Sequence, residues 1–407
     1  MHLHSAKPGG RPGGQIAPVA LFGILIASAV LAMMFNTGQQ ITEKSRVANA
    51  ADAAAYSGAV WTARHLNFIA YTNRALIANH LAVGHFVSYV SWIRYVDDSI
   101  DSIDRVTQWV PYVGQYVDLV KQIASEVRDA TERGADVAIP AIDQWNTTVR
   151  TAQLETQLSL APDRLHELMT NVARAYAPSI HVNDIADLEL MPEPLRVALE
   201  AQLVEQLARV PGFVQRYTAG NDRNSVNELV DASRRANADL QRWIGSNRGW
   251  REDLLASQVR KRGTSAATQS SSSGDWQASD DLQYRKRIFA GWERWHRVGD
   301  RSSTASAREF ASNYGGVPSY YNLTGDPDDR SLPILAIATR RASSAAATNT
   351  AENSYPIAVA AMARVEFRRP PAGAVASLAK GRQEYANLFN PFWEAHLAPV
   401  ESAWGVH

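Results

Sequence analysis

The feature that most constrains this chain is an uncharged apolar run near its beginning. Residues Ile16 to Phe35 read IAPVALFGILIASAVLAMMF and contain no charged side chain. At about 1.5 Å per residue, a helix of this length crosses the roughly 30 Å hydrocarbon layer of a bilayer. Buried helices of soluble proteins usually interrupt such a run with polar residues within about 12 to 14 positions. The run therefore predicts a transmembrane helix over residues 16–36.

The residues that flank the span predict its orientation. Lys7 and Arg11 precede it and no acidic residue does, which places residues 1–15 in the cytoplasm under the positive-inside tendency. Charged residues between Glu43 and Arg46 follow the span, and they weaken this bias without reversing it. The rest of the chain is then expected on the far side of the membrane.

A cleaved secretory signal is the alternative interpretation of the same run. Such a signal needs a shorter apolar core that ends at small residues, as at Ala27-Ser28-Ala29. A cut at this point would leave Val30, Leu31 and Met33 at the start of the mature protein. We therefore expect the span to be retained.

The composition of the whole chain excludes several functional classes. Its 41 basic side chains balance 41 acidic ones, so it lacks the positive charge of a nucleic-acid-binding protein. The absence of cysteine excludes disulfides, thiolate metal sites and cysteine nucleophiles. A hydrophobic fraction of 45% is ordinary for a globular protein and leaves only one segment for the lipid.

The region after the span predicts a long helix in water. Residues 39–103 contain no proline and many alanines, so the membrane helix is expected to continue into them. Small residues recur there at three- and four-residue spacing: Ala48, Ala51, Ala55, Gly58 and Thr62. The spacing is typical of a helix-packing stripe that another helix can approach closely. An ordinary alanine-rich helix of high propensity is the alternative.

Further amphipathic segments predict a helical domain over residues 37–262. Proline and glycine divide it into helices over 116–133 and 141–176, from Pro192-Glu193-Pro194 to 207, and over 224–243, with breaks expected at Pro140 and at Pro211-Gly212. Short breaks and the lack of an internal repeat favour antiparallel packing over a solenoid.

The pattern changes beyond a serine-rich stretch. Residues 263–275 hold little that can be buried, which predicts a flexible linker or loop. The apolar run Pro333 to Thr339 predicts a buried strand, and residues Ala363 to Arg368 alternate between apolar and charged as a half-buried strand does. Residues 384–397 are expected to be helical or irregular. The fold class predicted is thus mainly α with a smaller α+β part over 276–407, where a short antiparallel sheet follows the helical bundle.

An aromatic segment near the end of the chain is a candidate anchor. It contains Asn387, Phe389, Asn390, Phe392 and Trp393, which combine ring burial with turn-forming amides. Docking onto the protein's own core and binding to a partner both explain it. Polar residues of the long helix, among them Asn67, Asn73, Asn79, Arg64 and Arg74, are expected to contact this C-terminal unit in preference to a substrate.

The motifs of catalytic and metal sites are incomplete in this sequence. His80 and His85 are five residues apart and so lie on different faces of a helix. His166-Glu167 has no second histidine at the zinc-protease spacing, and Gly315-Gly316 lacks the lysine of a phosphate-binding loop. No G-x-S-x-G sequence is present. We therefore expect no catalytic residues, no metal, no cofactor and no small-molecule substrate.

The N-terminal region resembles the TadE/TadG-like proteins of tight-adherence (Flp-type) pilus assembly. The resemblance rests on GGQIAPVALF, which leads into the span, and on VANAADAAAYSGA, residues Val47 to Ala59. Later segments, including VEFRRP and EYANLFNPFWEAHL, are similar to longer members of this group. The resemblance implies a single-pass protein of the bacterial inner membrane, with a periplasmic domain, that works with other pilus-assembly or secretion proteins and has no enzymatic activity.

Two departures from related families narrow this expectation. Processed pilins carry a glutamate five residues after a glycine cleavage site, but processing at Gly13 or Gly14 would place Pro18 or Val19 at that position. The chain therefore lacks the carboxylate of a repeating filament subunit. Some larger TadG-like proteins carry a von Willebrand A-type domain with an Asp-x-Ser-x-Ser metal site. Residues 97–102 (DDSIDS) are instead expected to lie on a solvated helix face.

The function expected is therefore a membrane-anchored assembly component or a minor pilin-like subunit. A surface-exposed adhesin is the first alternative, and it would expose the C-terminal aromatic residues. A membrane-tethered hydrolase is the second alternative, and it would gather serine, histidine and aspartate in a cleft.

Overall fold

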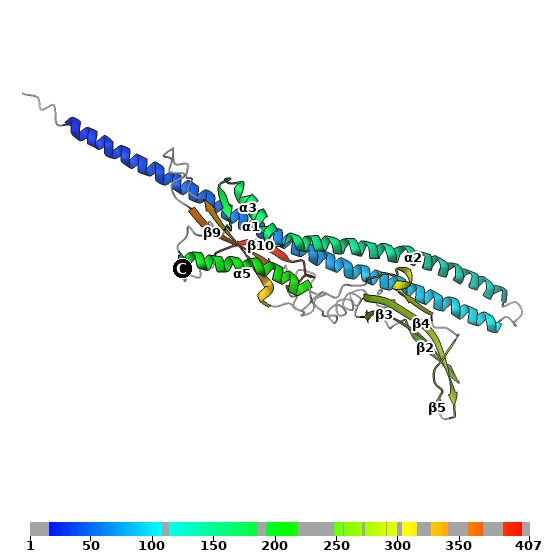
Figure 1. The fold of residues 1–407 in the computed structure, drawn as a ribbon. Helices are drawn as coiled ribbons and strands as arrows, with labels where there is room; N and C mark the ends of the chain where they lie inside the picture. Colours follow the sequence, from blue (N-terminus) through cyan, green and yellow to red (C-terminus); the bar gives the residue numbers. More distant parts are fainter. Residues whose placement is uncertain are drawn as a thin grey trace, which may run out of the picture.

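The computed structural model is an elongated molecule built on one very long helix (Figure 1). It describes residues 16–107, 114–184, 193–218, 248–254, 256–270, 273–289, 291–298, 303–315, 327–340, 357–368 and 386–400. Gly13, Gly14 and the helix predicted over 224–243 lie outside the described residues.

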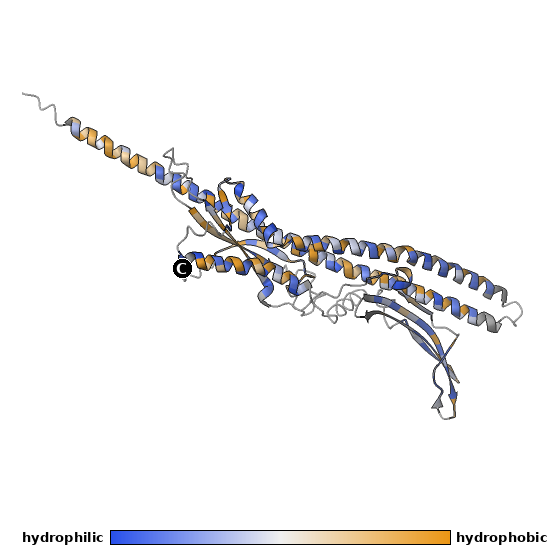
Figure 2. Ribbon diagram, in the orientation of Figure 1, coloured by the Kyte–Doolittle hydropathy of each residue, from blue (hydrophilic) through white to orange (hydrophobic). Residues whose placement is uncertain are grey.

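Helix α1 runs without interruption from Ile16 to Thr107. Its 92 residues span about 140 Å at about 1.5 Å per residue. The predicted continuation of the apolar span into a long helix is confirmed. The apolar first part stands apart from the folded elements, as Figure 2 shows in the colours of hydropathy, and the remainder is packed.

Helix α2, Gly114–Ser159, returns along the distal half of α1 as an antiparallel partner (Figure 1). The predicted break at Pro140 is wrong, because α2 passes through this proline. Proline in a helix interior costs about 3 kcal/mol through a lost backbone hydrogen bond and a steric clash. Burial of Ala135 and Ile139 in the turn that leads to the proline offsets that cost.

Two further helices follow α2. Helix α3 covers Pro162–Arg174, so the predicted helix over 141–176 is divided near residues 160–161 instead of continuing. Helix α5 covers Glu193–Thr218 and begins where the sequence predicts. It does not end at Pro211-Gly212 as predicted, since Phe213 and Tyr217 beyond that point are buried and hold the last turns in place.

Sheet A is antiparallel and has the strand order β1-β8-β9-β10. Its strands are β1 (Ile180–Val182), β8 (Ser331–Arg340), β9 (Ile357–Phe367) and β10 (Trp393–Ala398). The register pairs Ile334 with Ala363 and Trp393 with Phe367. Both strands predicted from periodicity, in β8 and β9, are therefore confirmed. Residues 384–397 are not helical where described, because 386–392 are irregular and β10 follows.

Sheet A lies between α1 and α5 (Figure 1). Ile334 and Ala336 of β8 and Val365 of β9 share one buried cluster with the alanines of α1 and with Met169 of α3. On the other face, Leu335 and Ile337 pack with Leu199 of α5.

Sheet B lies along the distal half of α1 (Figure 1). Its strands are β2 (Trp250–Leu254), β3 (Ser257–Ser270), β4 (Ser273–Ile288), β5 (Gly291–Trp292), β6 (His296–Arg297) and β7 (Ser303–Ser306). The short helix α8, Ala307–Phe310, follows β7, and the 3-10 turn η1, Pro327–Arg330, precedes β8.

The structure differs from the predicted serine-rich linker at residues 263–275. Residues 263–270 lie in β3 and residues 273–275 in β4, with Gly263 opposite Asp280 and Ala267 opposite Trp276. Small side chains suit this position because the hairpin lies against α1, where Ser265 is buried and its Oγ is 2.7 Å from Ser88 Oγ. The fold class, mainly helical with antiparallel sheets in the C-terminal part, is as predicted. The domain boundaries stay predictions.

The contact between α1 and sheet B generates a test of packing. A Cβ atom at Gly84 would lie 2.8 Å from Cε2 of Trp276, a rigid ring in the core, whereas a Cβ at Gly134 of α2 meets nothing within 4 Å. We expect Gly84→Ala to destabilise the protein by about 1–3 kcal/mol through overpacking. Gly134→Ala should stabilise it by up to about 1 kcal/mol through helix propensity. Denaturant unfolding of both variants in detergent measures the difference, and equal stabilities would contradict the packing described.

Candidate functional site

The first part of α1 presents apolar side chains to all sides. Leu21, Phe22, Leu25, Leu31 and Met34 are each 61% or more exposed. Of the helices in the described residues, α1 alone is long and apolar enough to cross a membrane, and none of its apolar window is buried by the protein. Such a surface is stable in a hydrocarbon environment and unfavourable in water. The helix is consistent with a single-pass membrane anchor.

The folded part begins at a buried ion pair just beyond this apolar segment. Glu43 is 5% exposed and accepts a hydrogen bond from Nη1 of Arg340, the last residue of β8. Arg46 lies 2.8 Å from the same carboxylate. Buried charges are stable only when they are paired, so this contact fixes the end of sheet A to α1 next to the anchor. Sequence reasoning assigned Glu43 only to the flank of the span and missed this role.

The predicted stripe of small residues faces the protein's own core. Ala51, Ala55, Gly58 and Thr62 are buried, and Ala48 is half-buried. A Cβ at Gly58 would lie 3.1 Å from Ile334 of β8 and 3.2 Å from Met169 of α3. The stripe therefore allows the close approach of a sheet and of one helix, both from the same chain.

The C-terminal aromatic residues also lie on α1 and sheet A. Asn387, Phe389 and Trp393 are at most 3% exposed, while Asn390 and Phe392 are half-buried. The Asn387 side chain accepts hydrogen bonds from the backbone N–H groups of Phe389 and Asn390 and so forms a turn. The contacts are those of docking onto the protein's own core.

Polar side chains of α1 hold this segment through its backbone. Asn67 donates to the carbonyl of Trp393 over 2.8 Å and accepts from its N–H over 3.0 Å, as a neighbouring strand would. Asn73 donates to the carbonyl of Leu388 over 2.8 Å. Arg74 donates to Phe389 O and to Asn390 Oδ1. Three of the five polar residues expected to contact the C-terminal unit therefore do so.

The other two polar residues lie elsewhere. Asn79 bonds to Asn146 of α2 over 2.8 Å, so it joins the helical hairpin instead. Arg64 is exposed on α1.

The comparison with known families concerns the region of the span, the ion pair and the stripe. Residues 14–61 match the family described as putative Flp pilus-assembly TadE/G-like. No curated protein and no solved structure gives a match. The TadE/G-like segment thus contains the whole apolar span and the first buried turns of α1, and it supports involvement of the chain in Flp pilus assembly.

Far from the TadE/G-like segment, three buried charges join α1 to sheet B. Asp280 is fully buried, and its carboxylate accepts hydrogen bonds from Arg248 over 2.8 Å and from Lys261 over 2.7 Å. Ser91 of α1 donates to the same carboxylate over 2.7 Å. Burial lowers the pKa of the Lys261 ammonium even though Asp280 opposes this.

This cluster was missed by sequence reasoning because its members come from separate parts of the chain. A signal was present in the alternation of Lys261, Gly263 and Ser265, which gives β3 one polar, small-residue face.

A second buried polar group lies midway along α1. His80 is 2% exposed, and its Nδ1 lies 2.6 Å from the hydroxyl of Tyr314. Burial, and secondly the charge of Arg150, lowers the pKa of His80 from 6.5 to about 3. The ring is therefore neutral in the folded protein, in agreement with a packed core histidine. Burial also raises the pKa of Tyr314.

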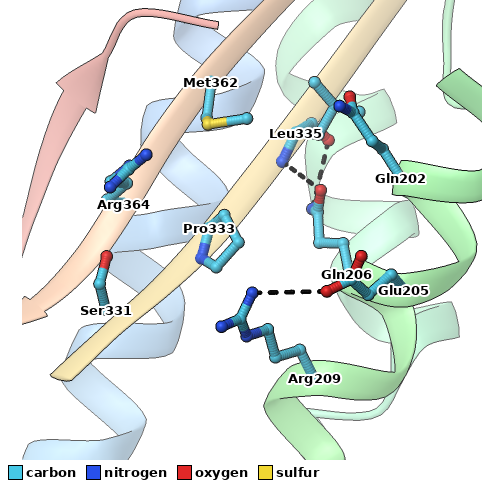
Figure 3. Close-up of a pocket in the computed structure, with 9 residues that line it drawn as sticks. All are labelled: Gln202, Glu205, Gln206, Arg209, Ser331, Pro333, Leu335, Met362 and Arg364. Atoms are coloured by element: carbon cyan, nitrogen blue, oxygen red, sulfur yellow. Dashed lines mark hydrogen bonds and ion pairs between the residues drawn. The ribbon is translucent and has the colours of Figure 1, made fainter. Parts of the chain in front are cut away.

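A cleft of about 320 Å³ lies between α5 and sheet A, as Figure 3 shows. Gln206 of α5 accepts from the N–H of Leu335 over 2.6 Å and so covers the edge of β8. The cleft is lined by Gln202, Glu205, Gln206, Arg209, Ser331, Pro333, Leu335, Met362 and Arg364. No histidine is among these lining residues, so they do not form the group of serine, histidine and aspartate that the hydrolase alternative predicts.

The acidic segment 97–102, expected on a solvated helix face, is buried at its first residue. Asp97 is buried on α1 and pairs with Arg128 of α2 as part of the helical hairpin. Within the described ranges, no group of three or more histidine, aspartate or glutamate side chains is arranged to hold a metal ion.

The Asp280 cluster generates a prediction about stability. Asp280→Asn keeps the shape of the side chain but leaves Arg248 and Lys261 buried without a counter-charge. We expect a loss of about 3–5 kcal/mol in the free energy of unfolding. Asp136→Asn on the exposed face of α2 is the matched control and should change it by less than about 0.5 kcal/mol. Similar values for both variants in denaturant unfolding would disprove the assigned role.

His80 generates a prediction about pH. Its pKa is lower in the folded protein than in the unfolded chain, so the unfolded chain binds the extra proton as the pH falls below about 6.5. Stability should therefore decrease towards acid by up to about 1.4 kcal/mol per pH unit from this group. The variant His80→Asn has no such proton. Its stability difference from the wild type should shrink between pH 6 and pH 4, and a constant difference would refute the buried neutral state.

Proposed function

We propose that this protein is a non-enzymatic, inner-membrane-anchored component of a tight-adherence (Flp-type) pilus-assembly system. In this proposal α1 enters the membrane with its N-terminus in the cytoplasm, and the folded part stands in the periplasm. A minor pilin-like subunit of the same system is the closest variant of the proposal.

One observation carries the proposal: the exposed apolar segment and the family match coincide. Residues 14–61 are TadE/G-like, and within them the helix is apolar on every side as far as Phe35, a few residues before the core begins at Glu43. The same helix then continues for the length of the folded part without a hinge. An anchor joined rigidly to a long support suits a protein that holds partners at a fixed distance from the membrane.

The arm formed by α1 and α2 offers surface to such partners. Apolar side chains recur on the outer side of α2 at helical spacing, and Val120, Ile123, Val127 and Val137 are 47–72% exposed. Exposed apolar stripes of this kind are typical of surfaces that bind other proteins. Other pilus-assembly or secretion proteins are the partners we propose.

Polar and charged groups buried in the described core have structural contacts. Asp280, Glu43 and Asn73 each tie a strand or the C-terminal segment to α1. This use of polar residues supports a scaffold in preference to an enzyme. The adhesin alternative depended on exposed C-terminal aromatics, but Phe389 and Trp393 are buried.

The anchor is tested by matched substitutions. Leu25 in the span and Leu158 on α2 are 61% and 64% exposed, so only their surroundings differ. Arginine near the middle of a span costs about 2.5–3.5 kcal/mol, and Leu25→Arg should move the protein from the membrane pellet to the soluble or degraded fraction. Leu158→Arg should leave it in the membrane. In a strain that lacks the gene, wild type and Leu158→Arg should restore surface pili and Leu25→Arg should not.

The outcome of this experiment separates the parts of the proposal. Wild-type protein in the soluble fraction would reject the anchor. Normal pili in the strain without the gene would reject the role in assembly. Activity of a reporter that works only in the cytoplasm, fused after His407, would show that the membrane orientation is opposite to the proposed one.

A further inference from the structure

The end of sheet B that points away from α1 carries a cluster of exposed apolar side chains. Phe289, in the connection between β4 and β5, is fully exposed, and Ile288 beside it is 45% exposed. Trp292 of β5 and Leu254 of β2 are 37% and 56% exposed. We call these four residues the apolar tip. Single exposed apolar residues are common, but a group at one projecting end indicates a binding surface.

Arginine side chains surround the apolar tip. The guanidinium groups of Arg260, Arg285 and Arg251 lie 4.0, 4.6 and 5.9 Å from the ring centre of Trp295. Arg285 also lies 5.0 Å from the ring of Trp292. The indole face holds these cations in place. Arg251 also pairs with Asp253 over 3.1 Å. Arg260 and Arg285 each donate Nε–H to a glutamine side chain, and their outer N–H groups can still bind an anion.

The charge of this part of sheet B is strongly one-sided. The exposed or half-buried bases in its described residues are Arg251, Arg260, Arg262, Arg285, Lys286, Arg287, Arg294 and Arg297. The exposed or half-buried acids there are Glu252, Asp253, Asp281 and Glu293. The whole chain is neutral, so the positive field is local to this end of the molecule. An anionic partner is the complement.

The apolar tip lies far from the anchoring membrane. Strand β4 contacts α1 through Asp280 and Ser91, and Ser91 is about 80 Å along the helix from Phe35. From this contact β4 continues away from α1 to Ile288 (Figure 1). Any membrane that the apolar tip contacts is therefore a different bilayer from the one that holds α1.

We propose that the apolar tip and its arginine collar bind the surface of a second, anionic phospholipid bilayer. Phenylalanine, isoleucine and tryptophan enter the boundary between head groups and acyl chains, and the arginines pair with lipid phosphates. This goes beyond the proposed function, and it does not depend on a role in pilus assembly. The projecting shape favours a membrane over a polyanionic chain, because a chain would use the arginines and leave Phe289 in water.

Binding between two membranes tests the proposal with the full chain. The protein is embedded in nanodiscs of neutral phosphatidylcholine and mixed with vesicles of equal parts phosphatidylcholine and phosphatidylglycerol, and co-flotation is measured. We expect binding to these vesicles, weaker binding at high salt and none to pure phosphatidylcholine vesicles.

Matched variants identify the residues that bind. Phe289→Ser should weaken binding at least about tenfold through lost apolar burial. Each of Arg260→Gln and Arg285→Gln should weaken it about fivefold. Phe68→Ser and Arg133→Gln, at exposed positions on α1 and α2, are the controls and should bind as the wild type does. Because Phe289 is fully exposed, its replacement should leave thermal unfolding unchanged.

Three results would overturn the proposal. The first is failure of the wild type to bind anionic vesicles. The second is an equal loss of binding in the control variants. The third is binding that soluble polyphosphate abolishes while Phe289→Ser has no effect, because this would identify a polyanion and not a bilayer as the ligand.

Discussion

The whole structure depends on one unbroken helix that passes through different surroundings. The first part of α1 has apolar side chains in every direction, as lipid requires. From Glu43 onward the helix is covered by α3 and sheet A, and later by α2 and sheet B. Small residues such as Gly58 and Gly84 bring these elements close to the helix axis. Every other element is positioned by its contact with this helix or by an element that has such a contact.

Side-chain amides replace backbone partners at several points where strands end. Asn67 bonds both backbone groups of Trp393, and Gln206 bonds both backbone groups of Leu335 at the edge of β8. Asn183 does the same at Ile337 and Leu335. Backbone groups at a sheet edge would otherwise be open to pairing with another chain. The sheet is therefore completed from within the molecule by residues that a periodicity argument treats only as polar.

The sequence predicted the elements whose signal is contained in one segment. The apolar run, the helix beyond it, and the strands over Pro333–Thr339 and Ala363–Arg368 all follow from local periodicity. The errors lie where packing outweighs local preference. Helices α2 and α5 pass through Pro140 and Pro211 because buried neighbours offset the cost of proline.

In the candidate site, too, some contacts could be predicted from the sequence and others could not. The contacts of Asn67, Asn73 and Arg74 with the C-terminal segment followed from polar residues in an apolar helix and an aromatic run that needs cover. The serine-rich hairpin and the Asp280 cluster did not, because a side chain such as Ser265 becomes a core residue only when another element supplies its hydrogen bond. Such pairs join residues that are far apart in the chain, so no regular spacing in the sequence predicts them.

The attachment of residues 386–393 to α1 has a consequence for the order of folding. Asn67 and Trp393 are separated by 326 positions, so the middle of α1 leaves the ribosome long before its cover has been synthesised. Contacts of this separation form slowly because a large loop must close first. For most of its synthesis, the nascent protein therefore has the apolar face of the middle of α1 exposed to water. The covering of this face by residues 386–393 is a late step of folding.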